Sequence, residues 1–247
     1  MEYDVAYSSS AGNAVLINDI LFDIGVTPKK DKMKKLIDKC IAIFISHRHG
    51  DHLNLQAYRY VSNYYPLKKV YVNEQTYNFI CKKTPKLSHD NLVIFGDQEK
   101  ILLENGTEII IYKTKHESGV DSTAYYGITD NLEEFIFATD FYDFNDLPKE
   151  NADYIFVEAN HDENYAWYLE QIAELKGRHL EPWIISSTGR HTTKQAALKY
   201  YDSHRNNKNS KFIPLHKSNR FYDMQDYKDE LDELMMNNKG DQLWLIL

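Results

Sequence analysis

Short apolar runs bounded by turn residues alternate along the chain with segments whose apolar residues recur every three to four positions. Runs of the first kind predict strands, and the second spacing predicts helices. The predicted strands are 14–17, 20–23, 41–45, 70–72, 92–95, 101–103, 108–112, 124–128, 135–138 and 154–158. The predicted helices are 32–39, 54–63, 74–81, 163–176, 192–204 and 225–235. Strands interleaved with helices predict an α/β sandwich of mixed sheets covered by helices.

The domain organisation follows from the lack of any internal repeat, low-complexity tract or linker in the sequence. We expect a single domain over residues 1–247, whose 43% hydrophobic content supplies an ample core. Asn105-Gly106 lies between two apolar runs and predicts a hairpin, because both residues tolerate positive φ. The two cysteines, Cys40 and Cys81, have neither metal-ligand nor redox-pair spacing, and we interpret them as buried hydrophobic residues.

Membrane association is not expected from this sequence. Its longest uninterrupted apolar stretch, 40–45, is far shorter than a membrane span, and residues 1–4 lack the pattern of a secretory signal. We therefore predict a cytoplasmic protein. The formal charge of -8 argues against nucleic-acid binding through positive charge alone. Residues 187–220 nevertheless carry eight basic residues and one acid, which indicates either a solvated face or a substrate surface.

The strongest chemical signal is a run of histidines and one aspartate directly after the predicted strand 41–45. Its members are His47, His49, Asp51 and His52. A loop leaving a strand can direct alternate side chains apart, so His47 and His49 would hold one cation while Asp51 and His52 reach another. Three histidines and an aspartate are not easily buried without a counter-charge. The run therefore predicts a metal site.

Further ligands must come from later loops, because these four residues do not complete two metal sites. His116 follows the strand 108–112, Asp140 follows 135–138, and His216 follows Phe212-Ile213-Pro214. Each candidate comes just past a strand, as the first cluster does. This repeated placement indicates a shared edge of the sheets.

The order of these residues resembles the five sequence motifs of the metallo-β-lactamase fold superfamily across nearly the whole chain, with Asp23 as the first. Segments 8–14, 21–25 and 157–162 look like the WalJ/YycJ group. The segment 191–197 looks like ribonuclease Z, and His216-Lys217-Ser218 resembles the terminal ligand motif of both groups.

This resemblance implies an αββα sandwich, with two facing mixed sheets flanked by helices and a dinuclear metal site at one edge. It places His47, His49 and His116 on the first metal. It places Asp51, His52 and His216 on the second, with Asp140 bridging the two. Asp23 would orient a ligand and not bind metal itself. Zinc is the default for these donors, and manganese or iron also suit them.

The resemblance also implies a reaction, in which a hydroxide held between the two metals is the nucleophile. His191 would protonate the leaving group with Glu158 as its partner, so the catalytic set is Asp51, Glu158 and His191. Arg190 intervenes where the family has Gly-His, and no insertion resembles the arm with which ribonuclease Z grips transfer RNA. Five residues are candidates for substrate binding: Arg190, Lys194, Lys217, Ser218 and Arg220.

Three functions compete at this point. The first is a metal-dependent phosphodiesterase, a nuclease on DNA or RNA or an enzyme of small cyclic or dinucleotide phosphodiesters. The second is a thioester, lactone or other carboxyl-ester hydrolase, which should tolerate loss of Glu158 and His191. The third is a metal-binding regulatory protein without turnover, which the complete ligand set disfavours.

Overall fold

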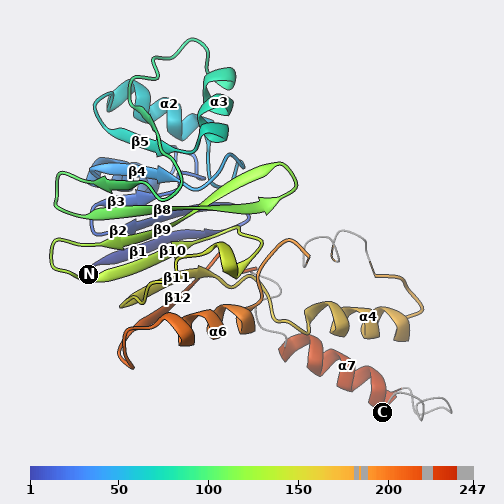
Figure 1. Cartoon of the computed structure of the whole chain (residues 1–247). Helices are drawn as coiled ribbons and strands as arrows, with labels where there is room; N and C mark the ends of the chain where they lie inside the picture. Colours follow the sequence, from blue (N-terminus) through green and yellow to red (C-terminus); the bar gives the residue numbers. More distant parts are fainter. Residues whose placement is uncertain (181–183, 185–188, 219–224, 238–247) are drawn as a thin grey trace.

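Two six-stranded mixed sheets form the centre of the computed structural model, which describes residues 1–180, 184, 189–218 and 225–237 (Figure 1). The first sheet has the order β1 (Tyr3–Ser9), β2 (Gly12–Ile17), β3 (Ile20–Phe22), β4 (Ala42–Ile45), β5 (Lys69–Val72) and β6 (Leu92–Ile94). The second has the order β12 (Lys211–Leu215), β11 (Tyr154–Glu158), β10 (Glu134–Ala138), β9 (Val120–Ile128), β8 (Glu108–Glu117) and β7 (Lys100–Leu102).

Strand direction is mixed within both sheets. In the first, β1, β2 and β3 are antiparallel, and β3 to β6 are parallel. In the second, β7 to β10 are antiparallel, whereas β10, β11 and β12 are parallel. Two antiparallel steps separate β8 from β10, so these strands also run in the same direction. The carboxyl ends of β8, β10, β11 and β12 therefore meet at one edge.

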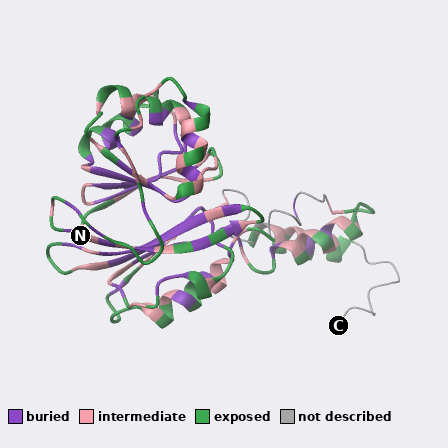
Figure 2. Ribbon diagram, turned by 45° about the horizontal axis from the view of Figure 1, so that its top comes forward, coloured by how far each residue is buried: buried purple, intermediate pink, exposed green. Residues whose placement is uncertain are grey.

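Alternation of side chains along the strands divides the core into layers. On β4, Phe44 packs between the two sheets, while Ile43 and Ile45 pack under helices α1 (Asp31–Lys39), α2 (Leu55–Tyr64) and α3 (Glu74–Lys83). Phe22 and Phe137 stack with ring centroids 4.6 Å apart and join the sheets. The central strands are mostly buried and the outer helix faces exposed, as Figure 2 shows.

Helix α6 (Lys194–His204) covers the outer face of the second sheet against β11 and β12. Two further helices, α4 (Tyr165–Leu175) and α7 (Gln225–Asn237), pack on each other beside the sandwich (Figure 1). The short 3-10 helix η1 (Phe144–Asp146) follows β10. Within the described ranges, none of the helices has the length and apolar character needed to cross a membrane.

The structure confirms the predicted α/β sandwich, with each predicted strand and helix present to within a few residues. Strand β1 was not predicted, because its polar and aromatic residues are only half-buried and give no apolar run. The predicted hairpin joins β7 to β8, but only Gly106 has positive φ, at 82°. Asn105 instead accepts a hydrogen bond from the Thr107 backbone N–H at 3.0 Å.

Candidate metal centre

The predicted ligands come together at the edge where the parallel strands end. His47 follows β4, Asp140 follows β10, and His216 comes directly after β12. His116 lies near the end of β8, where the ladder with β9 shifts register between Lys115 and Glu117. A bulge of this kind re-aims side chains at a strand end, and here His116 is buried.

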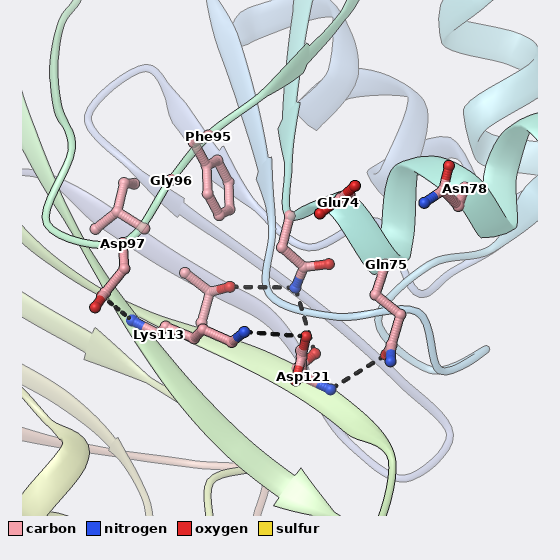
Figure 3. A pocket seen from close by; sticks show the side chains of 11 residues that line it. Glu74, Gln75, Asn78, Phe95, Gly96, Asp97, Lys113 and Asp121 are labelled. Carbon is pink, nitrogen blue, oxygen red and sulfur yellow. Dashed lines mark hydrogen bonds and ion pairs between the residues drawn. The ribbon is translucent and has the colours of Figure 1, made fainter.

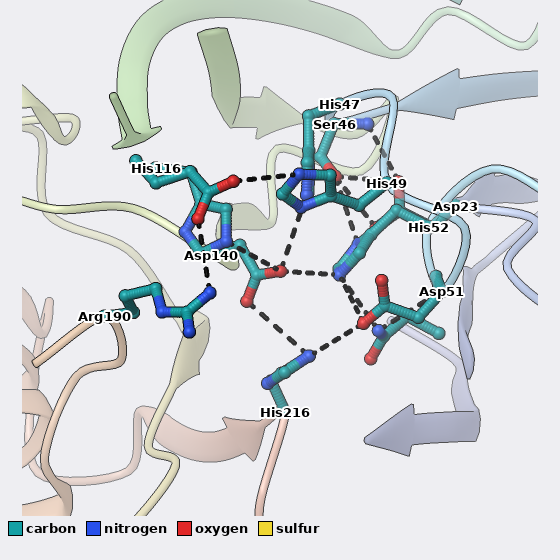
Figure 4. A network of polar contacts seen from close by, with 12 residues as sticks. Asp23, Ser46, His47, His49, Asp51, His52, His116, Asp140, Arg190 and His216 are labelled. Atoms are coloured by element: carbon teal, nitrogen blue, oxygen red, sulfur yellow. Dashed lines mark hydrogen bonds and ion pairs between the residues drawn. The ribbon is translucent and has the colours of Figure 1, made fainter. Parts of the chain in front are cut away.

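Asp140 occupies the middle of the cluster (Figure 4). Its Oδ2 atom lies 2.8 Å from His52 Nε2 and 3.6 Å from His47 Nε2. Its Oδ1 atom lies 3.6 Å from His216 Nε2. One carboxylate therefore faces both halves of the predicted site.

Donor atoms within 4.8 Å of one another form three groups that could hold a metal ion, and the second and third groups share Asp140 and His216. The first is His47, His49 and His116, and the second is Asp51, His52, Asp140 and His216. These match the two sets implied by the sequence. The third is Asp140, Glu158, His191 and His216, which brings the predicted acid pair to the same cluster.

Burial and hydrogen bonding show that these residues fit divalent metal ions. His47 and Asp140 are nearly inaccessible, yet His47 Nε2 and Asp140 Oδ1 have no hydrogen-bond partner among the described residues. Buried polar atoms are rarely left unpaired in proteins. Burial also lowers the pKa of His47 well below its usual range, which keeps the imidazole neutral and able to donate a lone pair. The nitrogen and oxygen donors suit zinc and also manganese or iron.

The two carboxylates of the cluster are held ionised. Burial opposes the charge on Asp140, but the neighbouring His216 and His52 outweigh it and hold the pKa of Asp140 well below its usual range. Burial likewise opposes ionisation of Asp51, and hydrogen bonds with His216 and His52 keep its pKa low. Anionic oxygens are the state that a divalent cation needs.

Of the comparisons with known proteins, only the comparison with solved structures found matches that support this arrangement. No protein-family model matches the chain, and no curated protein sequence matches it significantly. Among solved structures, the metallo-β-lactamase fold protein YhfI from Bacillus subtilis is 15% identical. The two align over 93% of this chain and 86% of YhfI, with a TM-score of 0.58. The chain has the metallo-β-lactamase fold.

Two other neighbours share that fold. The short form of human tRNase Z is 16% identical and aligns over 87% of this chain and 90% of its own, with a TM-score of 0.56. A diphosphatase from the PhnP family is 17% identical and aligns over 83% of this chain and 71% of its own, with a TM-score of 0.54. At these identities the likeness establishes the fold, while the roles of individual residues rest on the geometry of this chain.

Asp23 is fully buried directly after β3 and supports the ligand cluster through hydrogen bonds. Its carboxylate lies 2.6 Å from His52 Nδ1 and accepts hydrogen bonds from the Ser46 backbone N–H at 2.8 Å and the Ser46 hydroxyl at 2.9 Å. The Ser46 oxygen lies 3.1 Å from His47 Nδ1. This network orients two imidazoles so that their Nε2 atoms face the cluster.

Three residues of the site have left-handed backbone conformations, which residues with a side chain adopt only at some cost. They are Asp23 at φ 62°, Asp140 at φ 49° and His216 at φ 49°. The Asp140 N–H donates to Glu158 Oε2 at 2.9 Å, and the His216 N–H donates to Ser8 Oγ at 2.6 Å. These bonds fix the sharp turns that direct the side chains inward.

Sequence reasoning missed several residues that contact the ligands. Asn160 Nδ2 lies 3.1 Å from His216 Nδ1, and Asn13 Nδ2 lies 3.0 Å from His52 Nε2. Glu117 Oε1 lies 3.4 Å from His49 Nε2. Asn13 and Asn160 belong to the segments that carry the family resemblance, which was the available signal. Nothing in the sequence pairs Glu117 with His49.

The predicted acid pair is adjacent to the cluster. His191 Nδ1 lies 2.7 Å from Glu158 Oε1 and 3.6 Å from Asp140 Oδ1. Burial would lower the pKa of His191, but its hydrogen bonds with Asp140 and Glu158 outweigh burial and raise it to about 10. The intervening Arg190 does not displace His191, because the arginine side chain turns toward Glu117, with NH1 3.5 Å from Oε2.

The predicted substrate-binding residues do not gather as closely around the cluster as the metal ligands and the acid pair do. Lys194 lies 4.0 Å from Asp162, while Lys217 and Ser218 directly follow His216. Arg220 lies outside the described residues. The described basic residues of the stretch 187–220 do not all gather at the cluster. Lys211 begins β12 and Arg205 follows the end of α6, so each lies at the end of its element that is opposite His216 or His191.

Gly25 is the point at which the Asp23 turn touches the metal-binding loop. A Cβ atom there would lie 1.6 Å from the Asp51 carbonyl oxygen and 2.8 Å from the Asn13 nitrogen. We expect Gly25→Ala to lower the free energy of unfolding by roughly 1–3 kcal/mol, as overpacking does, and to weaken metal binding by displacing Asp51. Urea unfolding and metal analysis would measure both effects.

Gly50→Ala is the matched control, because a Cβ at Gly50 meets no atom within 4 Å. It should change stability by less than about 0.5 kcal/mol. Equal changes in unfolding free energy and metal content in the two variants would contradict the close approach at Gly25.

Proposed function

We propose that this chain is a metal-dependent hydrolase that cleaves phosphodiester bonds, in DNA, RNA or a small cyclic or dinucleotide substrate. Two divalent ions, zinc first and manganese or iron as alternatives, would be held by the first and second donor groups, with Asp140 of the second group also facing His47 of the first. When bound, such ions supply a nucleophile from water at neutral pH and neutralise charge on phosphoryl oxygens.

The observation that carries the proposal is the His191–Glu158 pair. A leaving alkoxide needs a proton, and the Glu158 carboxylate at 2.7 Å from His191 Nδ1 favours the protonated ring that can supply it. Glu158 is fully buried and occupies His191 Nδ1 at 2.7 Å, which leaves the other ring nitrogen to serve the substrate. Asp140, 3.6 Å away, places this acid beside the metal ligands.

Two structural neighbours agree with phosphate chemistry, since one is a tRNase Z and another a diphosphatase. Hydrolysis of a thioester has less need of a general acid, because its thiolate leaving group requires less protonation than an alkoxide. The acid pair therefore favours a phosphodiester substrate over a thioester.

The proposal is tested by offering three substrates to the zinc- or manganese-loaded protein: bis-p-nitrophenyl phosphate, an acyl thioester and a lactone. We expect turnover of bis-p-nitrophenyl phosphate to exceed that of the other two, and Glu158→Gln to slow hydrolysis of a dinucleotide, whose leaving group is an alkoxide, more than hydrolysis of the thioester. Turnover of the thioester or lactone alone, unaffected by Glu158→Gln, would replace the proposal by a carboxyl-ester hydrolase.

A further inference from the structure

A pocket of about 620 Å³ opens directly beside the metal cluster and shares His116 with it. Its other walls include Lys115, Gly119, Tyr142 and Arg190. We call this space the rim pocket. Its volume is within the range that holds a small organic ligand, and His116 places one end of such a ligand at the metals.

Tyr142 is an unusual component of this wall. Its side chain is 73% exposed, whereas the preceding Phe141 is 1% exposed and packs in the core. The Tyr142 backbone N–H donates to the Lys115 carbonyl at 2.5 Å, which ties the loop carrying Asp140 to β8. No aromatic ring stacks on Tyr142 among the described residues. A flat ring is thus held in solvent two residues from the central carboxylate.

Some charged residues around the rim pocket form ion pairs with each other, and one does not. Arg190 lies against Glu117, and Asp121 lies 3.4 Å from Lys113. Lys115 is exposed and forms no ion pair within the described part of the chain. The pocket therefore offers one uncompensated cation near an exposed aromatic ring.

The far wall of the pocket is a turn that several hydrogen bonds hold. Gly119 has φ 79°, and its carbonyl accepts hydrogen bonds from Gln75 Nε2 at 2.9 Å and Arg48 NH2 at 3.3 Å. Gln75 also accepts from the Asp121 backbone N–H at 3.1 Å, which Figure 3 shows from the side of a neighbouring pocket. Arg48 and Gln75, which are also hydrogen-bonded to each other, thus attach this turn to the first sheet's side of the molecule.

We propose that the rim pocket binds the nucleoside next to the scissile phosphate, with its base stacked on Tyr142 and a flanking phosphate on Lys115. This inference rests on the proposed phosphodiesterase function and narrows its substrate to nucleotides. An aromatic platform beside a cation is the combination that binds a base and its backbone without reading sequence. Tyr142 acts here in substrate binding and takes no part in the chemistry.

Two chromogenic esters with the same leaving group test this inference: the p-nitrophenyl ester of thymidine 5′-phosphate and methyl p-nitrophenyl phosphate. The wild type should prefer the nucleoside ester. Tyr142→Ala should reduce that preference, as the ratio of the two kcat/KM values, by roughly tenfold, mainly through KM, because stacking on one base has that magnitude. Tyr142→Phe keeps the ring and should restore the preference.

Tyr64→Ala is the matched control, since Tyr64 is 69% exposed on α2 and does not line the rim pocket. It should keep the wild-type ratio. An equal loss on both esters in Tyr142→Ala would show that Tyr142 only supports the Asp140 loop. An unchanged ratio in Tyr142→Ala would also overturn the inference.

Phosphodiester hydrolysis and nucleoside binding in the rim pocket can fail independently, and the measurements distinguish the two cases. If the wild type hydrolyses neither ester, the proposed function is wrong. Calorimetric titration with thymidine 5′-phosphate then tests by itself whether the rim pocket binds a nucleotide. The inference expects binding about tenfold weaker in Tyr142→Ala than in Tyr64→Ala. Equal binding, or none to the wild type, would overturn it.

Discussion

Asp140→Asn should remove metal from the protein and lower phosphodiester hydrolysis by well over a hundredfold. Asp140 belongs to both the second and the third donor groups, as His216 does, and its Oδ2 atom also faces His47 of the first group at 3.6 Å. The amide keeps the shape of the side chain but removes the negative charge that both metals would share. Replacing a residue that only contacts a metal-binding side chain typically lowers metal affinity or activity 10- to 100-fold. A larger loss therefore indicates that Asp140 binds the metal directly. Metal analysis and steady-state kinetics would measure the two effects.

Asp143→Asn provides the control for that variant. Asp143 caps η1 by accepting a hydrogen bond from the Asn145 N–H at 2.8 Å, and asparagine caps equally well. The same chemical change three residues away should leave metal content and rate unaltered. An Asp140→Asn protein with full metal content would contradict the central position of this carboxylate.

His191→Gln should keep both metals and slow phosphodiester hydrolysis by roughly 10²- to 10⁴-fold, the usual contribution of a general acid. The loss should be greater for a dinucleotide, whose leaving group is an alkoxide, than for a p-nitrophenyl ester, whose leaving group needs little protonation. His204→Gln is the matched control, because His204 ends α6 and its Nδ1 lies 2.9 Å from the Tyr200 carbonyl oxygen. Equal loss with both leaving groups, or loss of metal in His191→Gln, would remove His191 from the role of acid.

Much of this site could be predicted from sequence because its ligands follow strands. The run from His47 to His52 identified one loop, and His116, Asp140 and His216 each lay near the end of a predicted strand. Parallel strands place their carboxyl ends at one edge, so the pattern alone was enough to expect a cluster.

The remaining contacts depend on features that leave no local pattern. The bulge between Lys115 and Glu117 brings Glu117 to His49, and the sequence does not show a register shift. The pairing of Ser8 with His216 joins residues 208 positions apart, through a strand that was not predicted. Exposure of Tyr142 beside a buried Phe141 likewise follows from how the Asp140 loop packs on β8.

The most direct test of a dinuclear phosphodiesterase is the titration of chelated, metal-free protein with zinc or manganese while bis-p-nitrophenyl phosphate hydrolysis is followed. We predict that the rate is absent without metal and reaches its maximum at two equivalents per chain. A chelated protein that retains its rate, or a fully loaded one that hydrolyses no phosphodiester, would contradict the proposal.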